Sequence, residues 1–206
     1  MVQVFHLKIL SQAYHHGNGN GQEGHRGEIQ KGDPVKLTIE ALNDGKIVAI
    51  QGIGGFHLAA NPNYREAVKK LRLDKERERK PFALMVKDLE TAEEIVYLEE
   101  EDKKILSSPV SPIMILQKKD VIPKELNMVS DIETLGIFLP YTPLHLLLFF
   151  HPKETIEYRY LIMTSGNIKD EPIITDPPVA ISKLRQTADL FLYNNRRILF
   201  RTDDSI

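Results

Sequence analysis

Residues 71–86 read Leu-Arg-Leu-Asp-Lys-Glu-Arg-Glu-Arg-Lys-Pro-Phe-Ala-Leu-Met-Val and join a charged segment to an apolar one. Five cations fall within nine residues, just before an apolar run that is typical of a buried strand. Lys75 and Arg77 stand two positions apart, so an extended backbone would point both toward one side, where they could hold a phosphate or carboxylate. Three acidic residues are interleaved with the cations, and a solvated charged surface is therefore the alternative interpretation.

Outward from this stretch, helical patterns and short apolar runs alternate along the chain. The helix expected at 34–43 has Asp33 as a candidate N-cap and Pro34 at its first position. The other expected helices are 64–71, 88–107, 143–150 and 176–184, and the expected strands are 46–51, 82–86, 113–116, 135–139, 161–164, 190–193 and 198–200. This alternation predicts an α/β fold in which helices cover a sheet of short, buried strands.

The composition excludes several classes of protein and of site. The chain has 206 residues and no cysteine, which excludes disulfides, a thiolate nucleophile, sulfur-bound zinc and iron–sulfur clusters. No apolar run approaches the roughly 20 residues that cross a bilayer, and the N-terminus lacks a secretion signal, so we expect a cytoplasmic protein without a membrane partner. Lys and Arg total 27 against 29 Asp and Glu, so any phosphate site must come from local clustering of cations.

The first 31 residues differ from the rest of the chain. Residues 13–27 hold five glycines and show no apolar periodicity, which is typical of a connector. We therefore predict a flexible, Gly- and His-rich leader at 1–31 and a globular domain at 32–206. Four histidines of the leader could bind a metal ion, although a solvated linker explains them more simply. They are His6, His15, His16 and His25.

Two further segments could carry chemistry, and each directly follows an apolar run. Gly52-Ile53-Gly54-Gly55 could bring backbone amides close to an anion, but a tight turn or bulge explains these glycines as well. Thr164-Ser165-Gly166-Asn167 would place a hydroxyl and an amide at the carboxyl end of a strand, where α/β sheets bind ligands. A turn closed by its own side chains is an equal explanation for this second segment.

The order in which these segments occur is more specific than any one of them. The set consists of residues 52–58, 71–86, 111–116, 135–148, 164–167, 171–173 and 195–205. Over about residues 33–206 this order resembles the YrdC-like domain of the HypF carbamoyltransferases of hydrogenase maturation, which is related to the threonylcarbamoyl-adenylate synthases. The resemblance implies a YrdC/RibB-like open, twisted, mixed α/β sheet with flanking helices around a positively charged cavity.

The resemblance also implies an activity, the ATP-dependent activation of a carbamoyl group. Carbamoyl phosphate, or a carbamoyl donor derived from bicarbonate, would react with ATP to give a carbamoyl adenylate, in hydrogenase maturation or a related pathway. A transferase domain or a HypE-like acceptor protein would then take the carbamoyl group in trans. Three alternatives remain open: a threonylcarbamoyl-adenylate synthase-like protein, a double-stranded RNA- or tRNA-binding module, and a degenerate domain that binds nucleotide without turnover.

Family roles can be carried onto matching positions of this sequence. The resemblance implies that Lys75, Arg77, Ser165 and Asn167 are catalytic and bind the nucleotide. The other residues expected at nucleotide or phosphate are Lys80, Gly54, Gly55, Arg196, Arg201 and Ser205. Asp203 and Asp204 are candidate contacts to the Mg²⁺ that accompanies ATP. We expect no zinc, and the leader at 1–31 would be the remnant of a linker or zinc-finger region in either an excised fragment or a stand-alone relative.

Overall fold

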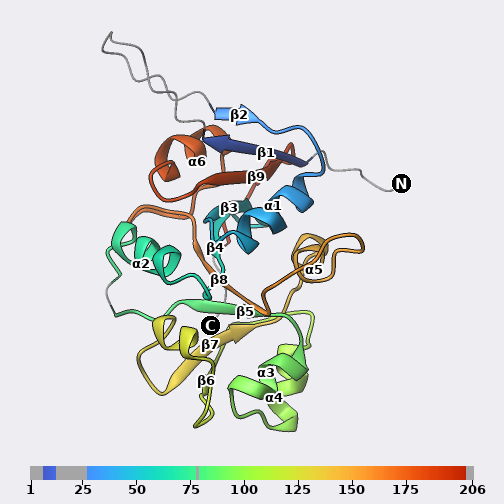
Figure 1. Ribbon diagram of the computed structural model, residues 1–206, viewed down its shortest axis with the longest axis vertical. Coiled ribbons are helices and arrows are strands. Elements are labelled where there is room, and N and C mark those ends of the chain that lie inside the picture. The colour runs from blue at the N-terminus through green and yellow to red at the C-terminus, as the bar shows by residue number, and fades with distance from the viewer. Residues whose placement is uncertain (1–6, 13–26, 78, 203–206) are drawn as a thin grey trace.

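The computed structural model describes residues 7–12, 27–77 and 79–202. In these residues nine strands form one sheet in the order β2-β1-β9-β3-β4-β8-β5-β7-β6, which runs from top to bottom in Figure 1. The strands are β1 (Leu7–Gln12), β2 (Gly27–Ile29), β3 (Val48–Gln51), β4 (Phe56–Ala60), β5 (Ala83–Val86), β6 (Met114–Gln117), β7 (Thr134–Phe138), β8 (Tyr160–Ser165) and β9 (Leu190–Asn194). The helices are α1 (Pro34–Asn43), α2 (Arg65–Asp74), α3 (Leu89–Ile95), α4 (Glu100–Leu106), the 3₁₀ helix η1 (Lys124–Met128), α5 (Pro143–Phe149) and α6 (Pro177–Leu184).

The sheet is mixed, as the resemblance implies. β3 runs parallel to β9, and β5 runs parallel to β7, while every other neighbouring pair is antiparallel. β8 lies between β4 and β5 and is antiparallel to both. Both edges of β8 are therefore hydrogen-bonded, and these two ladders hold the end of the strand in place.

Successive side chains of a strand point to opposite faces of the sheet, and each face has its own hydrophobic core. Val48 and Ile50 of β3 join the core under α1 and α5, whereas Ala49 between them joins the core under α2 and α6. Figure 1 shows these two pairs of helices on opposite sides of the upper strands. Burial on both faces explains why the inner strands β3, β4 and β8 read as continuous apolar runs. None of the helices described has the length and apolar content needed to span a membrane.

Local signals in the sequence determine the ends of several helices. The Asp33 carboxylate accepts from the amide of Val35 at 2.9 Å and caps α1, with Pro34 at its first position, as predicted. The helical region expected at 88–107 instead forms two helices, α3 and α4. They are separated at Val96, which pairs with Lys118 as an isolated bridge. This contact with the segment after β6 interrupts the helix.

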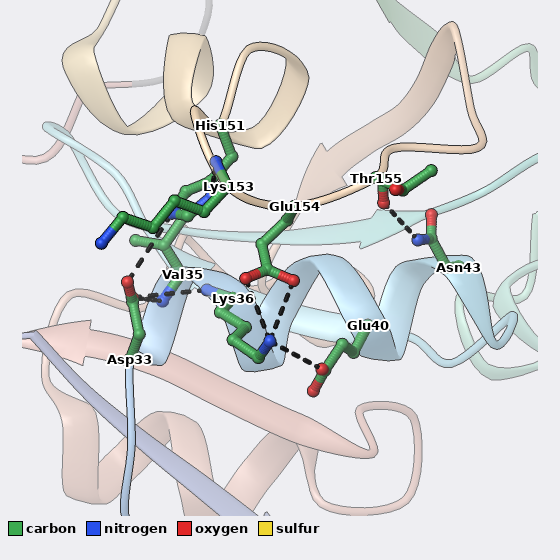
Figure 2. A network of polar contacts seen from close by, with 9 residues as sticks. All are labelled: Asp33, Val35, Lys36, Glu40, Asn43, His151, Lys153, Glu154 and Thr155. Atoms are coloured by element: carbon green, nitrogen blue, oxygen red, sulfur yellow. Dashed lines mark hydrogen bonds and ion pairs between the residues drawn. The ribbon is translucent and has the colours of Figure 1, made fainter.

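Polar contacts join α1 to the loop that leads into β8 (Figure 2). Lys36 Nζ donates to both carboxylate oxygens of Glu154 at 3.0 and 3.1 Å, and this bond raises the pKa of the lysine. Asn43 Nδ2 donates to the carbonyl of Thr155 at 2.9 Å, and His151 Nε2 lies 3.6 Å from the Asp33 carboxylate. The loop thus lies along α1 before the chain enters the sheet.

The prediction of a flexible leader at 1–31 is wrong for the residues of that range that the structure describes. β1 pairs antiparallel with β9, and β2 pairs with β1. Ile9 is fully buried in the core under α1. β1 shields an edge of β9 that would otherwise be exposed, so the sheet includes residues ahead of the predicted boundary at 32. Residues 13–26, with three of the four histidines, and His6 lie outside the described residues.

The strand expected at 198–200 is also wrong. Leu199 and Phe200 are exposed, and the chain leaves the sheet after Asn194. Within the described range, the amide of Thr202 donates to the carbonyl of Gly54 at 3.3 Å. A short apolar run forms a strand only where a neighbour offers backbone groups for a ladder. Here it is Thr202, just after the run, that contacts the turn after β3.

Truncation of Ile9 tests whether β1 belongs to the folded domain. We expect Ile9→Ala to lower the free energy of unfolding by about 2–5 kcal/mol, because it leaves a cavity in the core. Urea denaturation would measure the change. Lys8→Ala, on the exposed side of the same strand, is the control and should have little effect. Equal, small effects of both substitutions would show that β1 is not part of the cooperative unit.

Candidate functional site

Three predicted segments meet at the carboxyl end of β8. In the β4–β8 pair, His57 lies opposite Ser165, so the end of β8 adjoins the turn at 52–55. In the β5–β8 pair, Ala83 lies opposite Met163, so the end of β8 also adjoins the basic segment before β5. Antiparallel pairing on both sides of β8 therefore brings all three segments together.

Lys75 forms the direct link between the basic segment and the end of β8. It caps the C-terminus of α2, and Glu76 after it adopts a left-handed conformation with φ of +46°. Lys75 Nζ donates to the carbonyl of Ser165 at 2.9 Å and to Asn167 at 2.7 Å (carbonyl) and 2.6 Å (Oδ1). An ammonium group has three N–H donors. The structure thus joins Lys75, Ser165 and Asn167, which the sequence placed at two distant positions.

The loop that follows β8 is held from both sides. Ser165 Oγ lies 2.7 Å from Asn167 Oδ1, and Asn167 Nδ2 donates to the carbonyl of Glu171 at 2.5 Å. The amide of Gly166 donates to the carbonyl of Phe56 at 2.6 Å. A Cβ atom at Gly166 would lie 2.6 Å from that same carbonyl oxygen, so a glycine is needed at this close approach. These contacts hold the loop against β4 and the segment at Glu171.

Arg77 places a half-buried cation beside this loop. Its Nη1 donates to Thr164 Oγ1 at 3.0 Å, and its guanidinium lies 5.3 Å from the centroid of the Phe82 ring. Burial lowers the pKa of Arg77, and the charge of Arg72 lowers it further. Its Nε is buried without a hydrogen-bond partner in the described part of the chain. Such a cation is suited to binding an anion.

A cavity of about 490 Å³ lies beside the end of β8. Its polar lining comes from Arg77, Lys80, Thr134, Thr164 and Ser165. Its apolar lining comes from Pro81, Phe82, Ala83, Ile113, Ile115, Ile132, Gly136 and Met163. The size is within the range of small-molecule sites, about 300–1,000 Å³. Two cations beside apolar walls could hold a ligand that combines an anionic group with an apolar ring.

The glycines of the 52–55 turn pack against other parts of the chain. A Cβ atom at Gly54 would lie 2.3 Å from the carbonyl oxygen of Thr202, and one at Gly55 would lie 2.5 Å from the Ile173 side chain. Close packing therefore accounts for both glycines, in line with the tight-turn interpretation. Their predicted contact with phosphate stays a prediction.

The remaining predicted residues lie apart from this cavity or outside the described residues. Arg196 lines two other cavities, of about 320 and 520 Å³, and its carbonyl accepts from Gln51 Nε2 at 3.3 Å. Arg201 is exposed next to Thr202. Ser205, Asp203 and Asp204 are outside the described residues. Within the ranges that are described, no group of three or more His, Asp or Glu side chains could hold a metal ion.

Three residues that shape the site lie in segments that the sequence singled out, but no individual role was predicted for them. Thr164 accepts from Arg77, Phe82 packs against its guanidinium, and Arg72 bonds the carbonyls of the basic segment. Arg72 lies in the charged stretch that the sequence singled out, at the last turn of a helix. No local pattern distinguishes it from its exposed neighbours, because two of its partners, the carbonyls of Met128 and Val129, lie more than 50 residues away.

The family model described as "Telomere recombination", which covers Sua5, YciO and YrdC, matches residues 40–206. The chain belongs to the Sua5/YciO/YrdC family. The match spans most of the chain and includes every predicted catalytic residue, so it confirms the resemblance and the fold class drawn from the sequence.

Relatives of this Sua5/YciO/YrdC chain include carbamoyltransferases. The carbamoyltransferase HypF2 of Cupriavidus necator is 38% identical, in a match that covers 86% of this chain and 23% of the relative. The probable carbamoyltransferase HypF of Methanocaldococcus jannaschii is also 38% identical, over 86% of this chain and 22% of the relative. The chain thus spans less than a quarter of the length of these proteins.

Solved structures of HypF and Sua5 share the fold of this chain. Full-length HypF in its phosphate- and nucleotide-bound form superposes with a TM-score of 0.80 and 39% identity, over 98% of this chain and 24% of that chain. A Sua5 structure from P. abyssi superposes with a TM-score of 0.64 at 19% identity, over 80% of this chain and 46% of that one, and shows the fold alone. This Sua5/YciO/YrdC domain therefore corresponds to one part of HypF.

A double-mutant cycle tests the link between Lys75 and Asn167. We expect Lys75→Met and Asn167→Ala to be coupled by about 0.5–3 kcal/mol in the free energy of unfolding, because they share hydrogen bonds. Chemical denaturation of the two single variants and the double variant measures this coupling.

Lys70→Met, in the same helix, is the matched control for this cycle, because its ammonium faces Asp189 at 3.4 Å instead. Its effect should add to that of Asn167→Ala. Additive effects of Lys75→Met and Asn167→Ala would show that the observed contact does not stabilise the domain.

Proposed function

We propose that this domain uses ATP to activate a carbamoyl group and forms a carbamoyl adenylate. The observation that carries the proposal is the direct bonding of Lys75 to the Ser165–Asn167 loop beside a cavity lined by Arg77 and Lys80. Identity of 36–39% to HypF structures over nearly the whole chain supports a carbamoyl group as the part that is activated.

The proposed reaction joins a carbamate oxygen to ATP. Carbamoyl phosphate supplies the carbamate when water takes up its phosphoryl group as inorganic phosphate. The carbamate oxygen then forms a bond to the α-phosphorus of ATP, and the bond from that phosphorus to the bridging oxygen breaks to release pyrophosphate. Negative charge increases on the phosphate oxygens in this step. Fixed cations and hydrogen-bond donors are therefore the main catalytic requirement.

The residues of the cavity suit these requirements. Arg77 presents a planar guanidinium that can donate to two phosphate oxygens, and Lys80 adds a mobile point charge. Ser165 lines the same cavity. Its hydroxyl, which donates to Asn167 Oδ1, could turn to donate to a phosphate or carbamoyl oxygen instead. The apolar walls at Ile113 and Ile115 can contact the adenine ring. Lys75, which is bonded to the loop, would hold Ser165 and Asn167 in place.

The identity of the activated group separates this proposal from its nearest alternative. Threonylcarbamoyl-adenylate formation would need threonine and bicarbonate, and the Sua5 structures that share the fold are only 17–19% identical to this chain. The HypF relatives are about twice as similar in sequence. This difference favours carbamoyl phosphate over threonine as the second substrate.

Magnesium and a downstream acceptor are also part of the proposal. ATP would enter as its magnesium complex, and Asp203 and Asp204 remain proposed contacts to the metal. The adenylate would pass its carbamoyl group to a transferase domain or a HypE-like protein acceptor. These partners follow from the relatives, of which this chain spans less than a quarter.

Isotope exchange tests the proposed reaction directly. We expect exchange of labelled pyrophosphate into ATP that depends on carbamoyl phosphate. Arg77→Met should lower the exchange rate by about 10- to 100-fold, because a charged hydrogen bond contributes about 1.5–3 kcal/mol. Arg79→Met removes the same charge from an exposed position nearby and is the matched control.

Other outcomes distinguish the alternatives. Exchange supported by threonine with bicarbonate, and not by carbamoyl phosphate, would identify a threonylcarbamoyl-adenylate synthase. ATP binding by calorimetry without exchange would indicate a domain that binds nucleotide without turnover. Tight, strongly salt-dependent binding of double-stranded RNA in the absence of exchange would indicate an RNA-binding module.

A further inference from the structure

Arg72 lies behind the proposed anion site, in the last turn of α2. Its Nη1 donates to the carbonyls of Arg77 at 2.8 Å and Lys80 at 3.3 Å. Its Nε and Nη2 donate to the carbonyl of Met128 at 3.1 and 2.6 Å, and Nη2 also donates to the carbonyl of Val129 at 3.1 Å. One side chain thus connects a helix, the basic segment and the end of η1.

The two sides of the guanidinium have different partners. One side binds Met128 and Val129, and the carbonyl of Val129 also accepts from the amide of Phe82 at 3.0 Å, at the start of β5. The other side binds the carbonyls of Arg77 and Lys80, the two cations that line the cavity of about 490 Å³. Arg72 is not among the residues that line this cavity. Arg72 therefore holds the backbone of Arg77 and Lys80 by hydrogen bonds but does not line the cavity.

Both arginines also pack against one buried ring. The Arg72 guanidinium lies 4.8 Å from the centroid of Phe82, and that of Arg77 lies 5.3 Å from it. The charge of Arg72 lowers the pKa of Arg77, so the two groups repel each other and need favourable bonds elsewhere. The carbonyls bound by Arg72 supply them, and an anion in the cavity would reduce the repulsion.

We infer that Arg72 is a positioning residue for the proposed nucleotide site, holding Arg77 and Lys80 in the geometry that binds phosphate. A lysine could not replace it, because an ammonium group lacks the planar array of five donors that spans these carbonyls. This inference rests on the proposed function, since it assigns Arg72 a part in binding the same anionic ligand.

A thermodynamic cycle on ligand affinity tests the inference. Calorimetry would give the Kd for MgATP of the wild-type protein, Arg72→Met, Arg77→Met and the double variant. We expect Arg72→Met to weaken binding about tenfold, equivalent to about 1.4 kcal/mol. In the Arg77→Met background the same substitution should change Kd much less, because the residue through which Arg72 acts is already missing. Arg79→Met, the matched control, should leave Kd unchanged.

A purely structural role predicts a different result. Arg72→Met would then lower Tm while the folded variant kept the wild-type Kd, or its effect would add fully to that of Arg77→Met. Either outcome would overturn the inference. If Arg72→Met does not fold, Arg72→Lys retains the charge and most of the packing, and the same cycle is measured with it.

A second measurement is independent of ATP. Hydrogen exchange of the buried Arg77 Nε–H, followed by NMR on the ¹⁵N-labelled protein well below Tm, reports whether Arg77 keeps its position. Faster exchange in the Arg72 variant and unchanged exchange in Arg79→Met would support the inference, and unchanged exchange in both would overturn it. Failure of the wild-type protein to bind MgATP would contradict the proposed function, and exchange at Arg77 would still decide whether Arg72 positions it.

Discussion

The position of β8 between β4 and β5 is the constraint on which the site depends. Because both of its edges are hydrogen-bonded, the strand cannot shift without breaking two ladders. Its last residues therefore emerge at a fixed place, between the glycine turn and the basic segment. The antiparallel direction of both pairs determines that the end of β8, rather than its start, meets these two segments.

Uncharged oxygen atoms accept hydrogen bonds from each cation of the site. Carbonyl, amide and hydroxyl oxygens accept the hydrogen bonds of Arg72, Lys75 and Arg77 that define the site. The acidic residue between the last two, Glu76, pairs instead with Lys169 at 2.8 Å. Dipoles satisfy a cation's donors and leave its net charge in place.

The burial of these cations argues against the alternative interpretation of the charged stretch, a solvated surface. A solvated surface would leave all five cations exposed, with the acidic residues among them as partners. Arg72, Lys75 and Arg77 are instead partly buried, while Arg79 and Lys80 are exposed. The bend at Glu76 separates Lys75 from Arg77. Lys75 therefore contacts Asn167 in the loop after β8, while Arg77 contacts Thr164 within β8, and the two do not point to one side of an extended chain.

The sequence alone determined the parts of the fold that depend on local interactions. The cap at Asp33 with Pro34, the apolar runs of β3, β5 and β8, and the alternation of helices with strands all follow from neighbouring residues. The ordered segments were also sufficient to identify the family, because their spacing reflects the whole fold.

Only the tertiary structure decided which distant groups meet. It placed β1 beside β9, although the glycine-rich stretch that follows β1 in the sequence suggested a connector. It bonded Lys75 to Asn167 and Arg72 to the carbonyl of Met128, and it left 198–200 outside the sheet. Each of these results depends on partners far away in the chain. A lone sequence reports the propensities of a residue, whereas the partner that satisfies its hydrogen bonds is determined only when the sheet has formed.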